Sequence, residues 1–453
     1  MFSILNNCFL LLIFRKIAYS DWINKYKPSK LRPRENVSGA IRPPDVKGHF
    51  LLGSGRDFAE DAAGFLRSVG EKYGDMATIR LTFRRIAVLT DIHSFVAFGH
   101  ERRFDFRPIV DQVNLNVFGY RVQNVDDHKR RLLNFYKSSR MQDTVLLFDE
   151  NLTRSMNEYD GSSSTTAASA TSGQVNANDF VIDTGFAAIY RSILGCDDKN
   201  KNANNYSLFY KSYGSFMKYF NFLWLGLPIR LFPKGFRAFN EMVSLHPNVG
   251  GMIDDDGVCG YLRKAVEAMQ EEGKTDAEII GHNVEFIHVH VNAIRLAYWM
   301  MLFTLSDSTA YAALMDEIDD LVKQRRATAG ENDDETNICL DIEDVEGLNI
   351  LDSIFTESLR LVSGVLVIRG VTQDVTFQTS NGNNYDLKRG ETIMFYPPAH
   401  HYDPEVFENP KQFQYDRFIG ATFQKNGRPV DKPVMGFGTL CIGQRFATYL
   451  AKW

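Results

Sequence analysis

Residues 433–453 read PVMGFGTLCIGQRFATYLAKW, and the architecture of the chain can be argued from this stretch. A glycine-rich turn leads to a lone cysteine, Cys441, and the residues after Gly443 form a helical pattern. The positive end of a helix and its free N–H groups favour a thiolate at such a position. Gly443 leaves the backbone open to a flat partner, and Ala447 keeps the same helical face small. The stretch therefore suits an axial thiolate beneath a haem iron, and a buried structural cysteine after an ordinary turn is the alternative.

Composition narrows the class of protein. The chain has 453 residues with 34 Phe and 19 Tyr, enough for a large core or for a core that encloses a sizeable group. A net charge of −5 argues against nucleic acid as a partner, because phosphate binding favours a basic face. The 5 cysteines are dispersed, with no CxxC pair, which indicates a reducing compartment and a cysteine that acts alone.

The N-terminal region, residues 1–42, is predicted to be a tail and hinge that precede a catalytic domain at 43–453. Its apolar run from Phe2 to Phe14 would span roughly 20 Å as a helix, short of the roughly 30 Å of a hydrocarbon core. The basic residues that follow favour a cytoplasmic body if the run inserts. A membrane anchor is one interpretation of the run, and a signal-peptide segment or a misassigned start is the other.

The rest of the chain is predicted to be mainly helical, with a small β region near each end. Residues 57–75 have helical periodicity, and residues 76–90 have the pattern of two short strands. The low-complexity stretch 161–173 and the acidic stretch 325–336 are expected to be loops. A long apolar helix is expected over 277–305.

Three charged residues precede the cysteine in a distinctive order. Glu357 and Arg360 occupy positions i and i+3 of one predicted helix, where they can pair. Arg417 follows, flanked by aromatic residues in YDRF, and the Gly-rich loop of Cys441 comes next. An ExxR pair alone is usually a surface ion pair, but this order and spacing resemble the cytochrome P-450 superfamily. The resemblance implies that Glu357, Arg360 and Arg417 form a buried charge network and that Cys441 is the proximal ligand of haem b, iron protoporphyrin IX.

The likeness runs from about residue 43 to the end and is weakest between about 140 and 270. The segments RFDFRP, LKRGE and DPEVFENPKQFQYDRF resemble the branch of prostacyclin synthase, sterol 12α-hydroxylase and cholesterol 7α-hydroxylase. The implied fold is mainly α with small β-sheets, the triangular-prism haem-thiolate fold. Family chains continue for about fifty residues past this point, so the resemblance implies C-terminal truncation, with a substrate-lining hairpin missing.

The long helix 277–305 would cross the distal face of the haem. His288 and His290 lie about 200° apart on a helix, which argues against a shared metal ion. Most family members carry an acid–alcohol proton relay here, whereas this branch has Gly-Asn-x-x-Pro. Asn292 matches the Asn and could orient a peroxide or dioxygen during the reaction, or be a core residue bonded to backbone. Arg295 replaces the Pro and could meet a substrate carboxylate or lie on the helix surface.

Further cofactor contacts are implied by position. Arg369, in the predicted strand after the ExxR helix, is expected to hold a haem propionate. Phe437, Gly443 and Ala447 are expected to line the haem together with Cys441. The loop departs from the family pattern: Val434, Phe437 and Thr439 stand seven, four and two residues before the cysteine, where an aromatic, a Gly and often Arg or His are usual. It looks one residue short, which puts haem seating in doubt.

The function predicted from these features is a haem-thiolate monooxygenase that oxidises a sterol or other lipid. Its expected partners are the lipid substrate, NADPH-cytochrome P-450 reductase and a membrane surface. Its expected location is the endoplasmic reticulum membrane, with the catalytic domain facing the cytosol. A prostacyclin-synthase-like isomerase of a lipid endoperoxide is the first alternative, and a catalytically impaired haem-binding relic is the second.

Overall fold

A computed structural model of the protein describes residues 39–50, 53–81, 84–122, 125–137, 139–159, 176–195, 205–224, 226–328, 342–439, 441 and 443–453. This chain folds into two compact units whose segments alternate along the sequence. The first, here called the sheet unit, comprises the chain up to Asp111 together with Leu359–Phe413 and Gly420–Cys441. The second, the helical unit, comprises Gln112–Ser358, Gln414–Ile419 and Ile442–Trp453.

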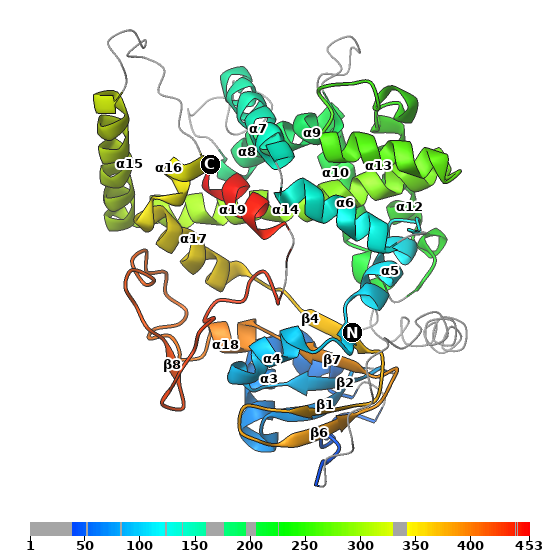
Figure 1. Ribbon diagram of the computed structural model, residues 1–453, viewed down its shortest axis with the longest axis vertical. Coiled ribbons are helices and arrows are strands. Elements are labelled where there is room, and N and C mark those ends of the chain that lie inside the picture. The colour runs from blue at the N-terminus through cyan, green and yellow to red at the C-terminus, as the bar shows by residue number, and fades with distance from the viewer. Residues whose placement is uncertain are drawn as a thin grey trace. The chain divides into compact units, whose positions relative to one another are not determined.

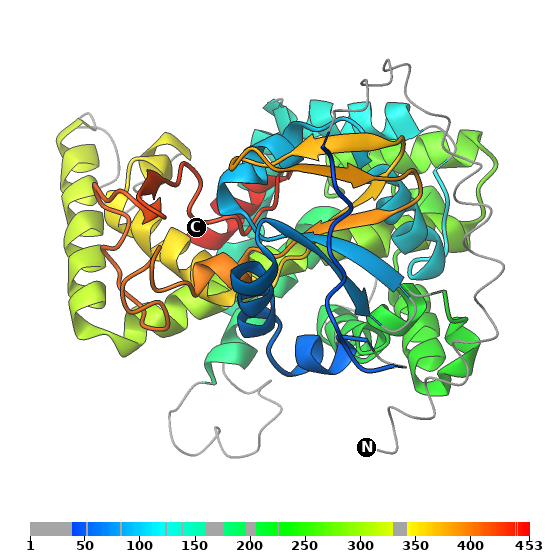
Figure 2. The same cartoon turned by 90° about the horizontal axis from the view of Figure 1, so that it is seen from below.

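The sheet unit is built on a five-stranded sheet that joins strands from both ends of the chain (Figure 2). Strands β2 and β7 pair in parallel, and the other neighbours are antiparallel. In sheet order the strands are β1 (Met76–Leu81), β2 (Arg84–Leu89), β7 (Thr392–Phe395), β4 (Val367–Val371) and β3 (Phe104–Asp105). Two small ribbons accompany it: β5 (Val375–Gln378) with β6 (Asn384–Leu387), and β8 (Gln424–Lys425) with β9 (Arg428–Pro429).

Both faces of the sheet are buried, because alternate residues of a strand point to opposite faces. In β2, Ala87 and Leu89 join a cluster with Phe95, Phe104, Phe377 and Phe395. Ile86 and Val88 join a second cluster with Leu66 of helix α3 (Gly55–Tyr73). The uninterrupted burial of β2 from Ile86 to Leu89 follows from this double covering.

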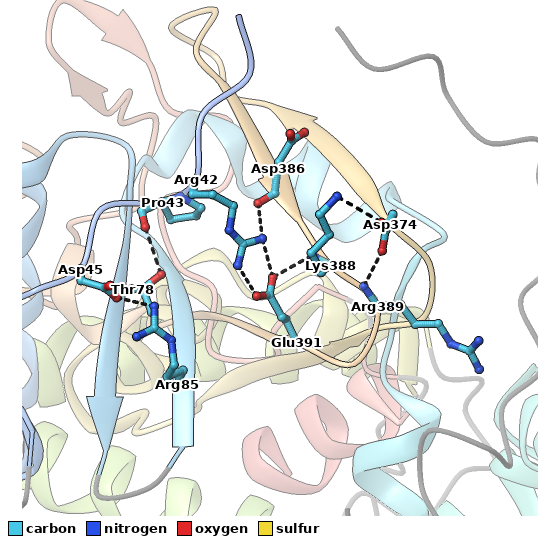
Figure 3. A network of polar contacts seen from close by, with 10 residues as sticks. All are labelled: Arg42, Pro43, Asp45, Thr78, Arg85, Asp374, Asp386, Lys388, Arg389 and Glu391. Atoms are coloured by element: carbon cyan, nitrogen blue, oxygen red, sulfur yellow. Dashed lines mark hydrogen bonds and ion pairs between the residues drawn. The ribbon is translucent and has the colours of Figure 1, made fainter. Parts of the chain in front are cut away.

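Polar contacts fasten residues 41–46 to the sheet unit (Figure 3). Arg42 donates to the Asp386 carbonyl at 2.8 Å and to the Glu391 carboxylate at 3.1 Å. Arg85 pairs with Asp45 at 2.6 Å. These pairs are solvent-exposed, so each contributes little stability alone, but together they fix the path of the chain into β1.

The helical unit is organised around α14 (Asp276–Ser306), a helix of 31 residues. Thr275 and Glu278 form a capping box at its N-terminus, which satisfies two backbone N–H groups. The helix is apolar over most of its circumference, as expected for one that neighbouring helices surround. The C-terminal helix α19 (Gln444–Lys452) packs against it (Figure 1).

The remaining helices of four or more residues are α4 (Phe95–His100), α5 (Arg107–Asn116), α6 (Val125–Lys137), α7 (Ser139–Glu158), α8 (Ala177–Val181), α9 (Ala187–Leu194), α10 (Asn205–Met217), α11 (Phe220–Trp224), α12 (Pro233–Leu245), α13 (Gly260–Glu271), α15 (Ser308–Thr328), α16 (Ile342–Glu346), α17 (Asn349–Val362) and α18 (Pro398–His401), with a π-helical turn at Ile182–Phe186.

The mainly helical class with small sheets is confirmed, as are the helix at 57–75, the two strands within 76–90 and the long helix at 277–305. The two β regions expected near the chain ends are one sheet, because β2 pairs with β7. The prediction of a loop at 325–336 was wrong at its start, because α15 continues to Thr328, and residues 329–336 lie outside the described residues. The loop at 161–173 and the apolar run near the N-terminus lie outside the described residues. In the described part of the chain, no helix is both long and apolar enough to span a membrane.

Candidate haem-thiolate site

The cysteine loop belongs to the sheet unit up to Cys441. A turn closes it, in which the Gly438 N–H donates to the Met435 carbonyl at 2.9 Å. Gly438 has φ +65°, a conformation in which any side chain is strained. A Cβ on Gly436 would lie 2.5 Å from Cγ of Leu359, so that position also excludes a larger residue. Cys441 follows the turn as an exposed residue, and its thiol is accessible to a ligand.

Arg369 in β4 contacts the same loop. Its guanidinium donates to the hydroxyl of Thr439, two residues before the cysteine, and lies over the Phe106 ring at 5.1 Å. Burial lowers the pKa of Arg369, against the opposing charge of Asp105. Within the described ranges Arg369 forms no ion pair with a carboxylate, although its charge is partly desolvated. A partly buried guanidinium of this kind fits a carboxylate supplied by a ligand.

His401 also holds the cysteine loop in place, and the sequence did not predict this contact. Its ring is fully buried, and its Nε2 accepts the Met435 N–H at 3.0 Å. Burial, with the nearby charges of His400 and Arg360, lowers its pKa to about 3. The imidazole is therefore neutral at physiological pH, and Nε2 remains an acceptor for the loop backbone.

Glu357 and Arg417 form a buried ion pair in the helical unit. Arg417 Nε lies 3.0 Å from Glu357 Oε1, and the two side chains are only 5% and 0% exposed. The Gln414 N–H donates to the same carboxylate oxygen at 3.2 Å. The pair therefore ties α17 to residues 414–419. Because both side chains are almost fully buried, loss of either one would be strongly destabilising.

Arg360 lies one turn further along α17 and acts within the sheet unit. Its Nη1 donates to the carbonyl of His401 at 2.7 Å and to that of Pro410 at 2.6 Å. The guanidinium also lies 4.8 Å from the centroid of the Phe407 ring. Arg360 thus holds both ends of the segment 401–410 through their backbone carbonyls. The ExxR spacing alone did not predict these contacts.

Helix α14 presents the residues expected on the distal side. Asn292 and Arg295 are exposed, so Asn292 is not the core residue of the alternative interpretation. His288 Nδ1 lies 2.7 Å from the Tyr213 hydroxyl, whereas His290 Nδ1 lies 2.5 Å from the Phe286 carbonyl. The two histidines therefore have separate partners, as their angular separation on a helix requires.

The start of α19 belongs to the helical unit. A Cβ on Gly443 would lie 3.3 Å from the Tyr136 ring, so this ring borders the glycine. Ala447 is half-buried, and its N–H donates to the Gly443 carbonyl at 2.9 Å. The neighbouring Phe446 is buried and packs on His290 with ring centroids 5.1 Å apart. The small residues Gly443 and Ala447 thus lie on either side of the buried Phe446 in the sequence.

The predicted residues are divided between the two units. Cys441, Phe437 and Arg369 belong to the sheet unit, and Arg369 contacts the cysteine loop through Thr439. Glu357, Arg417, Asn292, Gly443 and Ala447 belong to the helical unit. His401 and Thr439 were missed because their roles depend on partners 34 and 70 residues away.

Comparison with known proteins agrees with this geometry. The family model described as Cytochrome P450 matches residues 295–452. Cytochrome P450 7B1 of Mus musculus is 26% identical, over 92% of this chain and 82% of its own. The 5-beta-cholestane-3-alpha,7-alpha-diol 12-alpha-hydroxylase of Sus scrofa and the prostacyclin synthase of Rattus norvegicus are each 23% identical, over 89% of this chain and 83% of their own.

The fold, the motif order and these matches agree with the class of haem-thiolate proteins. As the sequence predicted, residues 295–452 match the cytochrome P450 family model, and most of the chain is similar to sterol hydroxylases and prostacyclin synthase. The cofactor of this family is haem b. The residues present fit such a group, since Cys441 is exposed and the Arg369 guanidinium forms no ion pair with a carboxylate among the described residues.

Proposed function

We propose that the protein is a haem-thiolate monooxygenase that oxidises a sterol or other lipid, with residues 43–453 as its catalytic domain. The observation that carries the proposal is that Arg369 donates to the Thr439 hydroxyl, two residues before Cys441, within one compact unit. An exposed thiol and a partly desolvated guanidinium, joined through the loop by Thr439, match a metal ligand and a propionate contact. The similarity to sterol hydroxylases supports a lipid substrate.

When bound, haem with a thiolate ligand supplies activation of dioxygen, because the thiolate favours cleavage of the O–O bond. Cys441 is assigned as the thiolate. Arg369 is assigned to a propionate, and the Thr439 hydroxyl accepts a hydrogen bond from the guanidinium and orients it. Phe437, half-buried in the same turn, is assigned as an apolar neighbour of the ring.

The charge networks are assigned a positioning role. Arg360 holds the carbonyls of His401 and Pro410, and His401 in turn accepts the Met435 N–H next to the Gly436–Gly438 turn. This relay of buried contacts fixes the loop that carries Cys441. Glu357 and Arg417 do the same for residues 414–419 in the helical unit.

Asn292 is assigned to the distal chemistry. Its exposed carboxamide offers a donor at Nδ2 and an acceptor at Oδ1, so it can orient water and dioxygen. The helix has no acid–alcohol pair at this point, and an amide is not an effective general acid or base at neutral pH. Protons would then come from water that Asn292 positions.

Partners and location follow from the same proposal. A monooxygenase of this type takes electrons from NADPH-cytochrome P-450 reductase, and a lipid substrate favours work at a membrane surface. The apolar N-terminal run supports the endoplasmic reticulum membrane, with the catalytic domain on the cytosolic side.

The direct test is turnover of a sterol panel with reductase, NADPH and isotope-labelled dioxygen. The proposal expects labelled oxygen in the lipid product, and no product with Cys441→Ala. Unlabelled product, or equal product from the variant, would contradict it.

The isomerase alternative has its own support. Prostacyclin synthase is among the similar proteins, and an isomerase needs no proton relay in α14. Rearrangement of a prostaglandin endoperoxide without NADPH or reductase would favour it over the monooxygenase. The haem-binding relic would be favoured if haem binds through Cys441 but neither assay shows turnover.

A further inference from the structure

One face of helix α14 carries a stripe of four polar residues and a tryptophan. Its members are Glu285, His288, Asn292, Arg295 and Trp299, spaced at i, i+3, i+7, i+10 and i+14. At about 100° per residue these positions share one face of the helix. Arg295 is the only Lys or Arg in the sequence from Asp276 to Ser306, so this face has a single fixed positive charge.

The stripe is accessible at its C-terminal end. Asn292 and Arg295 are exposed, and Trp299, one turn beyond Arg295, is 39% exposed. The neighbours Val291, Ala293, Ile294 and Leu296 are buried. The exposed face therefore combines the cation of Arg295 with the aromatic surface of Trp299. An amphipathic ligand can contact both, with its charged group on the first and its apolar part on the second.

The N-terminal part of the stripe is a fixed wall within the helical unit. His288 Nδ1 lies 2.7 Å from the hydroxyl of Tyr213 in α10, and the ring stacks on Phe220 at 5.7 Å. Phe118 lies 5.6 Å from the same imidazole. Burial and the charge of Arg295 lower the pKa of His288 to about 4, so the imidazole is neutral at physiological pH. Arg295 is then the cation beside a neutral imidazole and its aromatic neighbours.

We propose that Arg295 is the carboxylate-recognition residue of the substrate site, so that the preferred substrate is a lipid acid rather than a neutral sterol. This inference rests on the proposed lipid-oxidising function. The guanidinium would bind both carboxylate oxygens through paired N–H donors. The Tyr213–His288 pair and Trp299 would border the carboxylate and the adjoining apolar chain.

A neutral lipid is disfavoured at this face for a physical reason. Covering Arg295 with an apolar ligand removes water from the guanidinium without providing an anion, and that desolvation weakens binding. A ligand carboxylate compensates the charge. The same residue thus attracts acids and discriminates against their neutral analogues.

The test measures binding by equilibrium dialysis, independently of turnover. The probes are oleic acid and cholanic acid, each compared with its methyl ester and its alcohol. A charge-assisted contact of this type predicts that the wild-type protein binds at least one acid about tenfold or more tightly than its ester. Arg295→Gln should remove the preference, and Arg295→Lys should keep part of it.

Arg326→Gln is the matched control, because Arg326 is an exposed arginine on α15 outside the stripe. It should leave the acid preference unchanged. Equal binding of acids and esters by the wild-type protein, failure of both acids to bind, or a preference that survives Arg295→Gln would overturn the inference. A carbon monoxide spectrum on each variant reports the haem ligand separately, so failure of the proposed function and failure of this inference are distinguishable.

Discussion

Replacing Glu357 with Gln removes one negative charge from a buried pair while keeping the size of the side chain. The carboxylate receives Arg417 Nε at 3.0 Å and the Gln414 N–H at 3.2 Å. An amide oxygen can still accept one of these bonds, but the Arg417 charge, on a side chain only 5% exposed, loses its counter-ion. Breaking a buried pair in this way costs about 3–5 kcal/mol.

Urea unfolding of the haem-loaded protein measures the effect. With a denaturant slope of about 3 kcal/mol per molar, the transition midpoint should fall by about 1 M or more. The double variant Glu357→Gln/Arg417→Gln should lose less than the sum of the two single variants, because the buried charge is removed together with its partner.

The control is Asp320→Asn, which breaks an exposed pair with Lys323 on α15 of the same unit. Its midpoint should not change measurably, because water screens the pair. If Glu357→Gln behaves like this control, or if the double variant is simply additive, the assignment of Glu357 and Arg417 as a coupled buried pair is incorrect.

Three further predictions concern the cofactor loop and pH. Arg369→Met should lower the haem content of purified protein relative to Arg369→Lys, since only the latter can hold a propionate; equal haem content in both variants would contradict the assignment. Gly438→Ala should lower stability by about 1–2 kcal/mol, because φ +65° strains a Cβ, and an unchanged thermal midpoint would refute this. Burial lowers the folded-state pKa of His246 and of His282 to about 4, so the unfolded chain binds more protons between about pH 6.5 and 4. Stability should therefore decrease as pH falls through that window, and His246→Asn should flatten the slope by up to about 1.4 kcal/mol per pH unit; the wild-type slope in that variant would count against a neutral buried His246.

Local sequence patterns predicted most of the helices that matter here. The apolar run of α14 and the i, i+3 spacing of Glu357 and Arg360 on α17 are properties of neighbouring residues. The sequence alone was therefore sufficient to predict these two helices. The prediction of Cys441 as the haem ligand used a glycine-rich turn before a helix, which is also a local signal, together with the order of Glu357, Arg360 and Arg417.

Contacts between residues far apart in the sequence could not be predicted from local patterns. Pairing of β2 with β7 joins residues about three hundred positions apart, and the carbonyls that Arg360 holds lie 41 and 50 residues away. Thr439 stands where the family often has Arg or His, and only the structure shows that its hydroxyl receives the Arg369 guanidinium. Tyr213 became relevant because α10 brings its hydroxyl to His288, 75 residues along the chain.

The central claim is that Cys441 is the thiolate ligand of the haem. The carbon monoxide difference spectrum of the reduced protein tests it most directly, with Cys259→Ala as a control because Cys259 is buried in the helical unit. We predict the red-shifted thiolate band in the wild-type protein and in Cys259→Ala, and its loss in Cys441→Ala. A thiolate band that persists in Cys441→Ala, or one that is missing from the wild-type protein, would contradict the account.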